Sequence, residues 1–146
     1  MWDFFPGDLP RPVTVSKELY EAVHRFSDEK KMSIQSIFQL ALSRIWRMWN
    51  GGTTALEPAS VEAEHRVAQI FIDSAPPGRL NREYRIYIGF DGEKLFDFAC
   101  ELENLYIVRG TEGLIRRSIT WFLQEQGYLE GKKQISFEEV ESYVQA

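Results

Sequence analysis

The chain has 146 residues, of which 44% are hydrophobic and 14% aromatic. This is too much apolar surface for a disordered chain, and it is enough for one compact domain or two small halves that share a core. The only cysteine, Cys100, excludes an internal disulfide and a cysteine-based zinc site, and we expect it to be a small buried hydrophobic residue. These features predict a globular protein of a reducing compartment.

The sequence also argues against a membrane protein. No apolar run reaches the roughly 18 residues that a membrane-spanning helix needs. The first residues lack the basic region and the apolar stretch of a signal peptide. We therefore expect a soluble, cytoplasmic protein.

The formal net charge of −5 bears on the choice of partner. A nucleic-acid-binding protein usually presents a basic patch, so an acidic chain makes this function less expected. The acidity is uneven, however: residues 1–50 carry seven Lys or Arg against six Asp or Glu, whereas residues 83–126 carry five against eight. A local basic face is compatible with this distribution.

The first third of the sequence predicts an arm, a strand and two helices. Residues 1–12 are rich in proline, which donates no hydrogen bond to a sheet, and favour an extended arm. Residues 13–15 alternate as in a strand. Ser16 and Ser33 are typical helix N-caps, and each precedes apolar residues at helical spacing. The Asn-Gly-Gly sequence at 50–52 ends the second helix.

Residues 51–82 form a connection whose structure the sequence leaves open. Residues 60–73 are compatible with a helix, and equally with a segment that ends in a strand at 69–72. The Ser-Ala-Pro-Pro-Gly sequence at 74–78 predicts a turn or linker.

The second half repeats the order of the first. Residues 85–90 alternate strictly, so that Ile86, Ile88 and Phe90 share one face and Arg85 and Tyr87 point the other way.

Capped helices follow this strand. Asp91 is a candidate cap for a helix that reaches Leu102, and Thr111 opens a second helix that Gly127 ends. One more short helix is predicted after Ser136, which forms a capping box with Glu139.

This repeated order resembles the ribbon-helix-helix family of the CopG, Arc and MetJ type. The resemblance is carried by residues 85–91, 95–102 and 110–123, with a weaker copy at 13–16, 19–26 and 33–46. It implies an α+β, mostly helical fold in which two ribbon-helix-helix units in one chain form a pseudo-dimer, with a two-stranded antiparallel ribbon on a four-helix core and a short C-terminal helix. The units would occupy residues 1–50 and 83–127, joined by a connection at 51–82 and followed by a tail at 128–146.

The resemblance also implies a function, because in this family the paired strands enter the major groove of DNA. It indicates a DNA-binding protein with double-stranded DNA as its partner, either a transcriptional regulator or an accessory factor of a plasmid, a phage or conjugation. Tandem members of this kind are found among the accessory proteins of conjugative DNA transfer.

The candidate DNA-binding residues fall into two groups. On the strands, Arg85 and Tyr87 are candidates for base contacts, Thr14 is the candidate for such a contact on the first strand, and Arg11 is placed to reach a phosphate. The alternative for this face is an ordinary solvated strand surface. At the helix N-termini, backbone amides near two caps would meet phosphates with the help of neighbouring cations. These residues are Ser33 with Lys30 and Lys31, and Thr111 with Arg109.

Other conspicuous residues have simpler interpretations. We expect Arg116 and Arg117 to be solvated helix surface. The aromatic residues Trp46, Trp49 and Trp121, with Phe122 beside the last, are expected in the core or on a partner surface.

Two other functions compete with DNA binding. Catalysis is not expected, because His24 and His65 have no partner motif and the sequence lacks a phosphate loop, a nucleophile motif and metal-ligand spacing. We accordingly expect no catalytic residue, no metal and no cofactor. The stronger alternative is an acidic protein–protein interaction module, an inhibitor or adaptor that keeps the fold and binds a protein partner through an aromatic or acidic surface.

Overall fold

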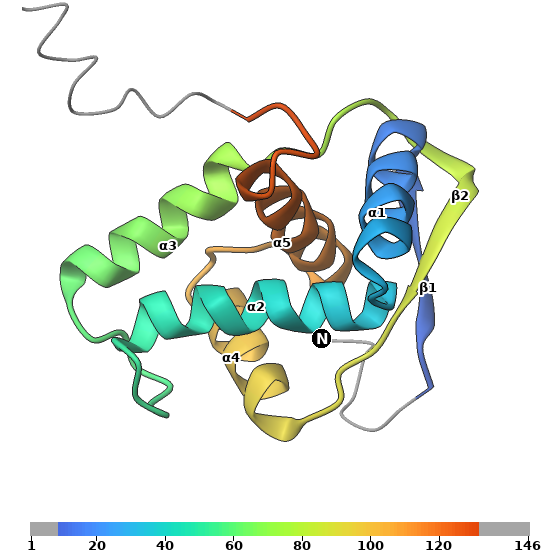
Figure 1. Cartoon of the computed structure of the whole chain (residues 1–146). Coiled ribbons are helices and arrows are strands. Elements are labelled where there is room, and N and C mark those ends of the chain that lie inside the picture. The colour runs from blue at the N-terminus through green and yellow to red at the C-terminus, as the bar shows by residue number, and fades with distance from the viewer. Residues whose placement is uncertain (1–8, 132–146) are drawn as a thin grey trace, which may run out of the picture.

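The computed structural model describes residues 9–131. In this part of the chain, a two-stranded antiparallel sheet lies along one side of a group of helices (Figure 1). The fold is therefore α+β and mostly helical, as the sequence predicts. The elements in chain order are β1 (Arg11–Ser16), α1 (Lys17–Lys30), α2 (Ile34–Asn50), α3 (Val61–Asp73), β2 (Leu80–Ile88), α4 (Glu93–Asn104) and α5 (Thr111–Glu125).

The two N-terminal helices begin, and α2 ends, where the sequence predicts. The Ser16 hydroxyl accepts a hydrogen bond from the Leu19 amide at 3.1 Å, and this caps α1. The Ser33 hydroxyl accepts one from the Ser36 amide, also at 3.1 Å, and caps α2. Gly51 closes α2 with a φ of 68°, a left-handed conformation that glycine adopts without steric cost.

The strands are longer than the sequence predicts. β1 begins at Arg11 and so includes Pro12, and β2 begins at Leu80, five residues before the predicted start at Arg85. Within the described residues each strand has one paired neighbour, so each lies at a sheet edge, where a residue without an N–H is tolerated. The predicted antiparallel pairing of the two strands is confirmed.

Two further differences concern the helices. The sequence is compatible with a helix at 60–73 or with a segment that ends in a strand at 69–72. The structure has a helix, α3, at residues 61–73. The cap of α4 is Gly92 and not Asp91, and no side chain caps that helix. Most of the predicted N-terminal arm, and the whole of the predicted helix after Ser136, lie outside the described residues.

The core forms where the inner face of the sheet meets the helices. Val13, Val15 and Ile88 are fully buried and Ile86 is 1% exposed, so the alternation predicted for both strands is confirmed. Most of the other core side chains come from the five helices of the described chain, with Phe90 and Val108 from connections. The sheet therefore has one face on the core and one face open.

Aromatic rings join the helices of this core. The Phe98 ring of α4 lies 5.8 Å from the buried Trp49 ring and 6.1 Å from the half-buried Trp46 ring of α2. The Phe26 ring of α1 meets the Phe122 ring of α5 edge to face at 5.3 Å. Such pairs add to the stability that burial alone provides.

Cys100 departs slightly from expectation. It is half-buried rather than fully buried, and burial together with the nearby Asp97 and Glu103 carboxylates raises the pKa of its thiol.

Between residues 9 and 131, no helix combines the length and the apolar character that crossing a bilayer requires.

Two isoleucines on helices provide a test of this core. Ile119 of α5 is fully buried, whereas the Ile72 side chain of α3 is 65% exposed. We expect Ile119→Ala to lower the free energy of unfolding by about 2–5 kcal/mol, because it removes buried methyl groups and leaves a cavity. The same substitution at Ile72 should change it by about 0.5 kcal/mol or less. Urea denaturation followed by circular dichroism measures both values, and similar losses would contradict the arrangement of α5 and α3.

Candidate nucleic-acid interface

The open face of the sheet brings three of the predicted strand residues together. In the register of the strands, Thr14 lies opposite Arg85 and Pro12 lies opposite Tyr87. Side chains directly opposite each other in an antiparallel pair are close neighbours on the same face. Arg85 is exposed, Tyr87 is 59% exposed and Thr14 is half-buried. We call Pro12, Thr14, Arg85 and Tyr87 the ribbon face.

Arg11 does not share this face. It lies opposite Ile88, and strand alternation places it on the same side as the buried Val13. Its side chain is exposed because β1 begins there. Arg11 therefore lies at the end of the ribbon, away from the other strand candidates.

A bulge beside Thr14 shapes the ribbon face. Thr14 lies opposite Arg85 and the next residue, Val15, lies opposite Asn81, so three residues of β2 have no partner in β1. The Asn81 side chain accepts the Glu83 amide at 2.9 Å, and the Arg85 Nε donates to the Arg82 carbonyl at 3.1 Å. The terminal nitrogens of Arg85 make no further hydrogen bond within residues 9–131, so they are available to a ligand.

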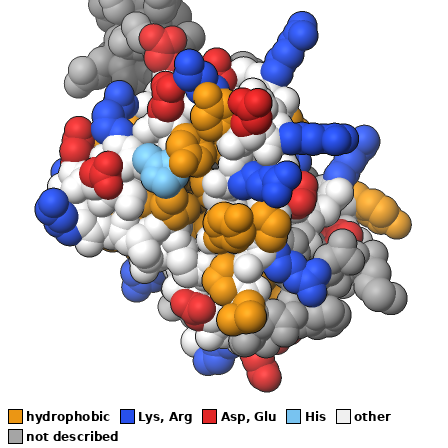
Figure 2. Space-filling view, turned by 90° about the vertical axis from the view of Figure 1, so that its right-hand side faces the viewer, with side chains coloured by type: hydrophobic (Ala, Val, Ile, Leu, Met, Phe, Trp, Pro, Cys, Tyr) orange, Lys and Arg blue, Asp and Glu red, His pale blue; other side chains and the backbone are white. Residues whose placement is uncertain are grey.

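The ribbon is basic although the chain is acidic. Residues 9–16 and 79–88 contain four arginines and one acidic residue, Glu83, which gives a net charge of +3 against −5 for the whole chain. Figure 2 shows this side of the molecule, where Lys and Arg side chains project beside a band of apolar side chains, with Asp and Glu side chains among them. A positive surface with polar and aromatic groups is suited to an anionic polymer. The arginines are Arg11, Arg79, Arg82 and Arg85.

The N-terminus of α2 lies where β2 ends. The Gln35 side-chain amide donates to the Gly89 carbonyl, and its Oε1 accepts the Gly89 amide at 2.7 Å. Just before α2, Lys30 and Lys31 are exposed, and Lys31 closes α1 in a left-handed conformation with a φ of 55°. The predicted Ser33 cap and its two lysines thus lie together at the start of α2.

The start of α5 differs from its prediction. Its N-cap is Gly110, with a φ of 140°, and no side chain caps the helix. Thr111 is the first helical residue and is only 7% exposed, so the Thr111 hydroxyl is not a cap. Gly110 takes the N-cap position with a φ in the region that favours glycine, so Thr111 falls inside the first turn, where it is buried. Arg109 is exposed, with no hydrogen bond or ion pair to another residue between 9 and 131.

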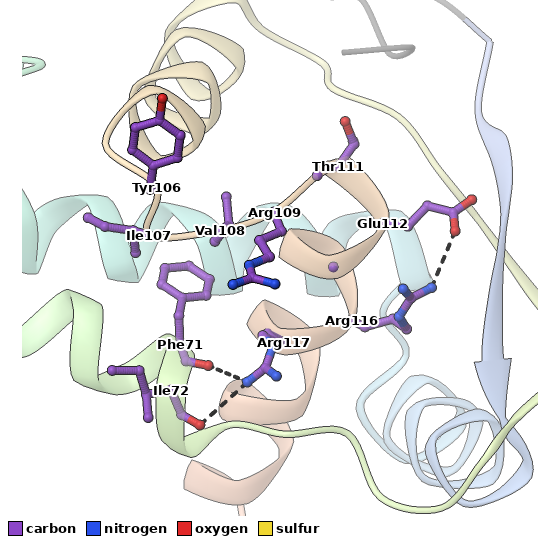
Figure 3. Close-up of a pocket in the computed structure, with 12 residues that line it drawn as sticks. Phe71, Ile72, Tyr106, Ile107, Val108, Arg109, Thr111, Glu112, Arg116 and Arg117 are labelled. Carbon is purple, nitrogen blue, oxygen red and sulfur yellow. Dashed lines mark hydrogen bonds and ion pairs between the residues drawn. The ribbon is translucent and has the colours of Figure 1, made fainter. Parts of the chain in front are cut away.

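A groove of about 730 Å³ runs along the first turns of α5, between the end of α3 and the loop before α5 (Figure 3). The Arg109 side chain lies in it, and Arg116 and Arg117 line the α5 side. Tyr106 lies at its edge with a φ of 60° and a side chain that is 92% exposed. The groove therefore carries three arginines.

The prediction that Arg116 and Arg117 are solvated helix surface is wrong. Both are half-buried, and each binds main-chain oxygens of another element. Arg116 donates to the Thr14 carbonyl at 3.0 Å and lies 3.4 Å from the Glu112 carboxylate. Arg117 donates to the Phe71 carbonyl and, at 3.4 Å, to that of Ile72, where the exposed carbonyls of α3 favour a cation.

Several residues that shape this interface are missing from the sequence-based prediction. Gln35 and Arg116 fix helix starts to strands that are distant in sequence, and nothing in their local sequence indicates the partner. Arg79 and Arg82 were detectable, because with Arg85 they place a positive charge at every third position of one short stretch.

Gln35 provides a test of the contact between α2 and β2. Gln35→Ala removes both partners of the buried Gly89 backbone, and we expect the free energy of unfolding to fall by about 1–3 kcal/mol. Gln39→Ala is the matched control, because Gln39 is also half-buried on α2 and its side chain makes no hydrogen bond to another described residue. Equal effects of the two substitutions in urea denaturation would contradict a specific role for Gln35.

Comparisons with protein-family models, with curated proteins and with solved structures find no match for this chain.

Proposed function

We propose that this protein binds double-stranded DNA by inserting its two-stranded ribbon into the major groove. The observation that carries the proposal is the antiparallel ribbon itself, which buries its apolar face in the helices and presents Thr14, Arg85 and Tyr87 outward. A two-stranded ribbon fits the width of the major groove, where base edges carry sequence information. The net positive charge of the ribbon also favours DNA as the partner.

The proposal includes a pseudo-dimer of two ribbon-helix-helix units. The first would comprise β1, α1 and α2, and the second β2, α4 and α5. Reciprocal contacts support it. Gln35 of the first unit binds the end of β2, and Arg116 of the second unit binds β1. In the same way α1 packs on α5 through Phe26, and α4 packs on α2 through Phe98.

The spacing of equivalent residues supports the same pair of units. Val13 and Ile86 lie opposite each other in the sheet and are 73 positions apart (86 − 13), while Ile37 and Leu114 in the second helices are 77 apart (114 − 37). The difference of four corresponds to the residues between β2 and α4, since β1 passes directly into α1. Over this stretch the two halves therefore differ by one short insertion, which lies between β2 and α4.

Each group at the interface has a distinct chemical role in this proposal. Arg85 would form paired hydrogen bonds to guanine, and Tyr87 and Thr14 would offer hydroxyl groups to base edges. Five cations outside the ribbon face would contact phosphates, aided by the helix N-termini. These are Lys30, Lys31, Arg79, Arg82 and Arg109. The biological role that fits best is transcriptional regulation or an accessory function in plasmid, phage or conjugative DNA processing.

A protein partner is the second candidate, and one observation favours it. The ribbon side carries apolar as well as basic side chains (Figure 2). On β2, Leu80 is 55% exposed, and the half-buried rings of Tyr20 and Tyr84 lie 5.2 Å apart. An apolar surface of this kind suits a protein interface better than a DNA groove. The two candidates differ in the response of binding to salt.

Salt dependence is the first test of DNA binding. If the five assigned cations contact phosphates, the slope of log affinity against log salt should be near −4.5, so raising salt from about 50 to 200 mM weakens binding roughly 500-fold. Fluorescence anisotropy with a labelled duplex of mixed sequence measures this. Absence of binding at about 50 mM salt would contradict the proposal and favour the protein partner.

A second test concerns the ribbon face. On a duplex selected from a random pool, the double substitution of Arg85→Ala and Tyr87→Ala should weaken binding by at least about 1–3 kcal/mol, because a bidentate contact to guanine is lost. Arg47→Ala is the control. It removes the same charge from an exposed position in the last turn of α2, about 20 Å along the helix from Ser33. If both variants bind as the unmodified chain does, the ribbon is not the reading surface.

A further inference from the structure

A second groove, of about 630 Å³, lies between α3 and α5. Its apolar side chains are Met48 of α2, Ile70 of α3 and Trp121 of α5, all half-buried and packed against the core. Around them lie polar and charged side chains: Arg66, Gln69 and Asp73 from α3, and Gln124 and Glu125 from α5. An apolar strip between charged edges is the form of surface that binds an amphipathic helix.

Trp121 indicates that the groove lacks an occupant in the described part of the chain. The indole N–H groups of Trp46 and Trp49 donate to the carbonyls of Ala55 and Leu56. The indole N–H of Trp121, in contrast, makes no hydrogen bond within residues 9–131. Half-buried tryptophans usually pair this group, so a hydrogen-bond acceptor is expected at this place.

The chain itself leads into this groove. Gly131, the last residue that the structure describes, is one of the residues lining it. The Gln124 side chain donates to the Glu130 carbonyl at 3.2 Å and leaves little room for a side chain at Gly131. The residues after 131 therefore start at the groove.

The sequence after 131 matches the groove in pattern and charge. Phe137, Val140 and Tyr143 recur at the spacing of one helical face, after the capping box that begins at Ser136. The segment opens with two lysines at 132–133 and continues with three glutamates at 138, 139 and 141. The groove has carboxylates at Asp73 and Glu125 and a cation at Arg66, so both signs find a counterpart.

We propose that residues 136–144 form an amphipathic helix that lies in the groove between α3 and α5 of the same chain. The five residues from Gly131 to Ser136 span up to about 17 Å, which reaches most of the length of α3. Phe137, Val140 and Tyr143 cover Met48, Ile70 and Trp121. A helix this short is marginal in water by itself, so its stability comes from the groove. The proposal is independent of DNA binding.

Hydrogen exchange of the full chain, measured by mass spectrometry, tests this proposal. In the unmodified chain the amides of residues 137–144 should exchange at least about tenfold more slowly than in an unstructured segment. The double substitution of Phe137→Ala and Val140→Ala should abolish this protection. Ser142→Ala, on the polar face of the same segment, should leave it unchanged. An unprotected segment in the unmodified chain overturns the proposal.

Two further measurements test whether residues 137–144 bind this groove or another surface. Ile70→Ser should remove the protection of residues 137–144 while the amides of α2 remain protected, because Ile70 lines the groove and is only half-buried. The indole N–H resonance of Trp121, assigned with Trp121→Phe, should shift in the Phe137→Ala and Val140→Ala double variant. Unchanged protection in Ile70→Ser overturns the groove assignment. Protection that rises with protein concentration means docking on a second copy, which overturns docking within one chain.

Discussion

The arrangement of this protein depends on the inner face of a two-stranded ribbon. Val13 and Val15 from one strand and Ile86 and Ile88 from the other need an apolar layer to cover them, since a sheet of two strands is marginal in water. The strands come from distant parts of the chain, so pairing them also brings their following helices together. The helices α1, α2 and α5 pack against the strands, and α4 packs against α2. Burial of one face fixes which side chains the other face presents.

The same constraint explains which parts of the fold the sequence predicts. Alternation in residues 85–90 identifies the inner and outer faces without knowledge of the partner strand, and this prediction is confirmed. Serine caps identify the starts of α1 and α2 because capping is a local interaction. The register and the bulge beside Thr14 depend on the other strand, so the sequence contains no local indication of them. The Gln35 contact with Gly89 spans 54 positions, and it is equally invisible to local patterns.

The arginines show the same limit at the candidate interface. Arg116 and Arg117 are adjacent, and their local sequence resembles an ordinary helix surface. In the fold, Arg116 binds the Thr14 carbonyl, 102 positions away, and Arg117 binds the last turn of α3. The sequence predicts Thr111 as a cap, but Gly110 takes the cap position and Thr111 is buried in the first turn of α5. The net charge of the whole chain also does not predict the charge of the candidate interface, because an acidic chain places a net charge of +3 on its ribbon.

The two helix starts beside the ribbon are not equivalent, and this bears on how DNA would bind. The start of α2 has a serine cap and two exposed lysines, with no acidic residue in its first turn. The start of α5 has one exposed arginine and Glu112, whose carboxylate is paired with Arg116. Phosphates would therefore be held more strongly at α2. Pro12 adds to this asymmetry, because its side chain offers no hydrogen-bonding group at the place that faces Tyr87. A ribbon built from two unlike strands, between two unlike helix starts, is suited to a non-palindromic site bound in one orientation.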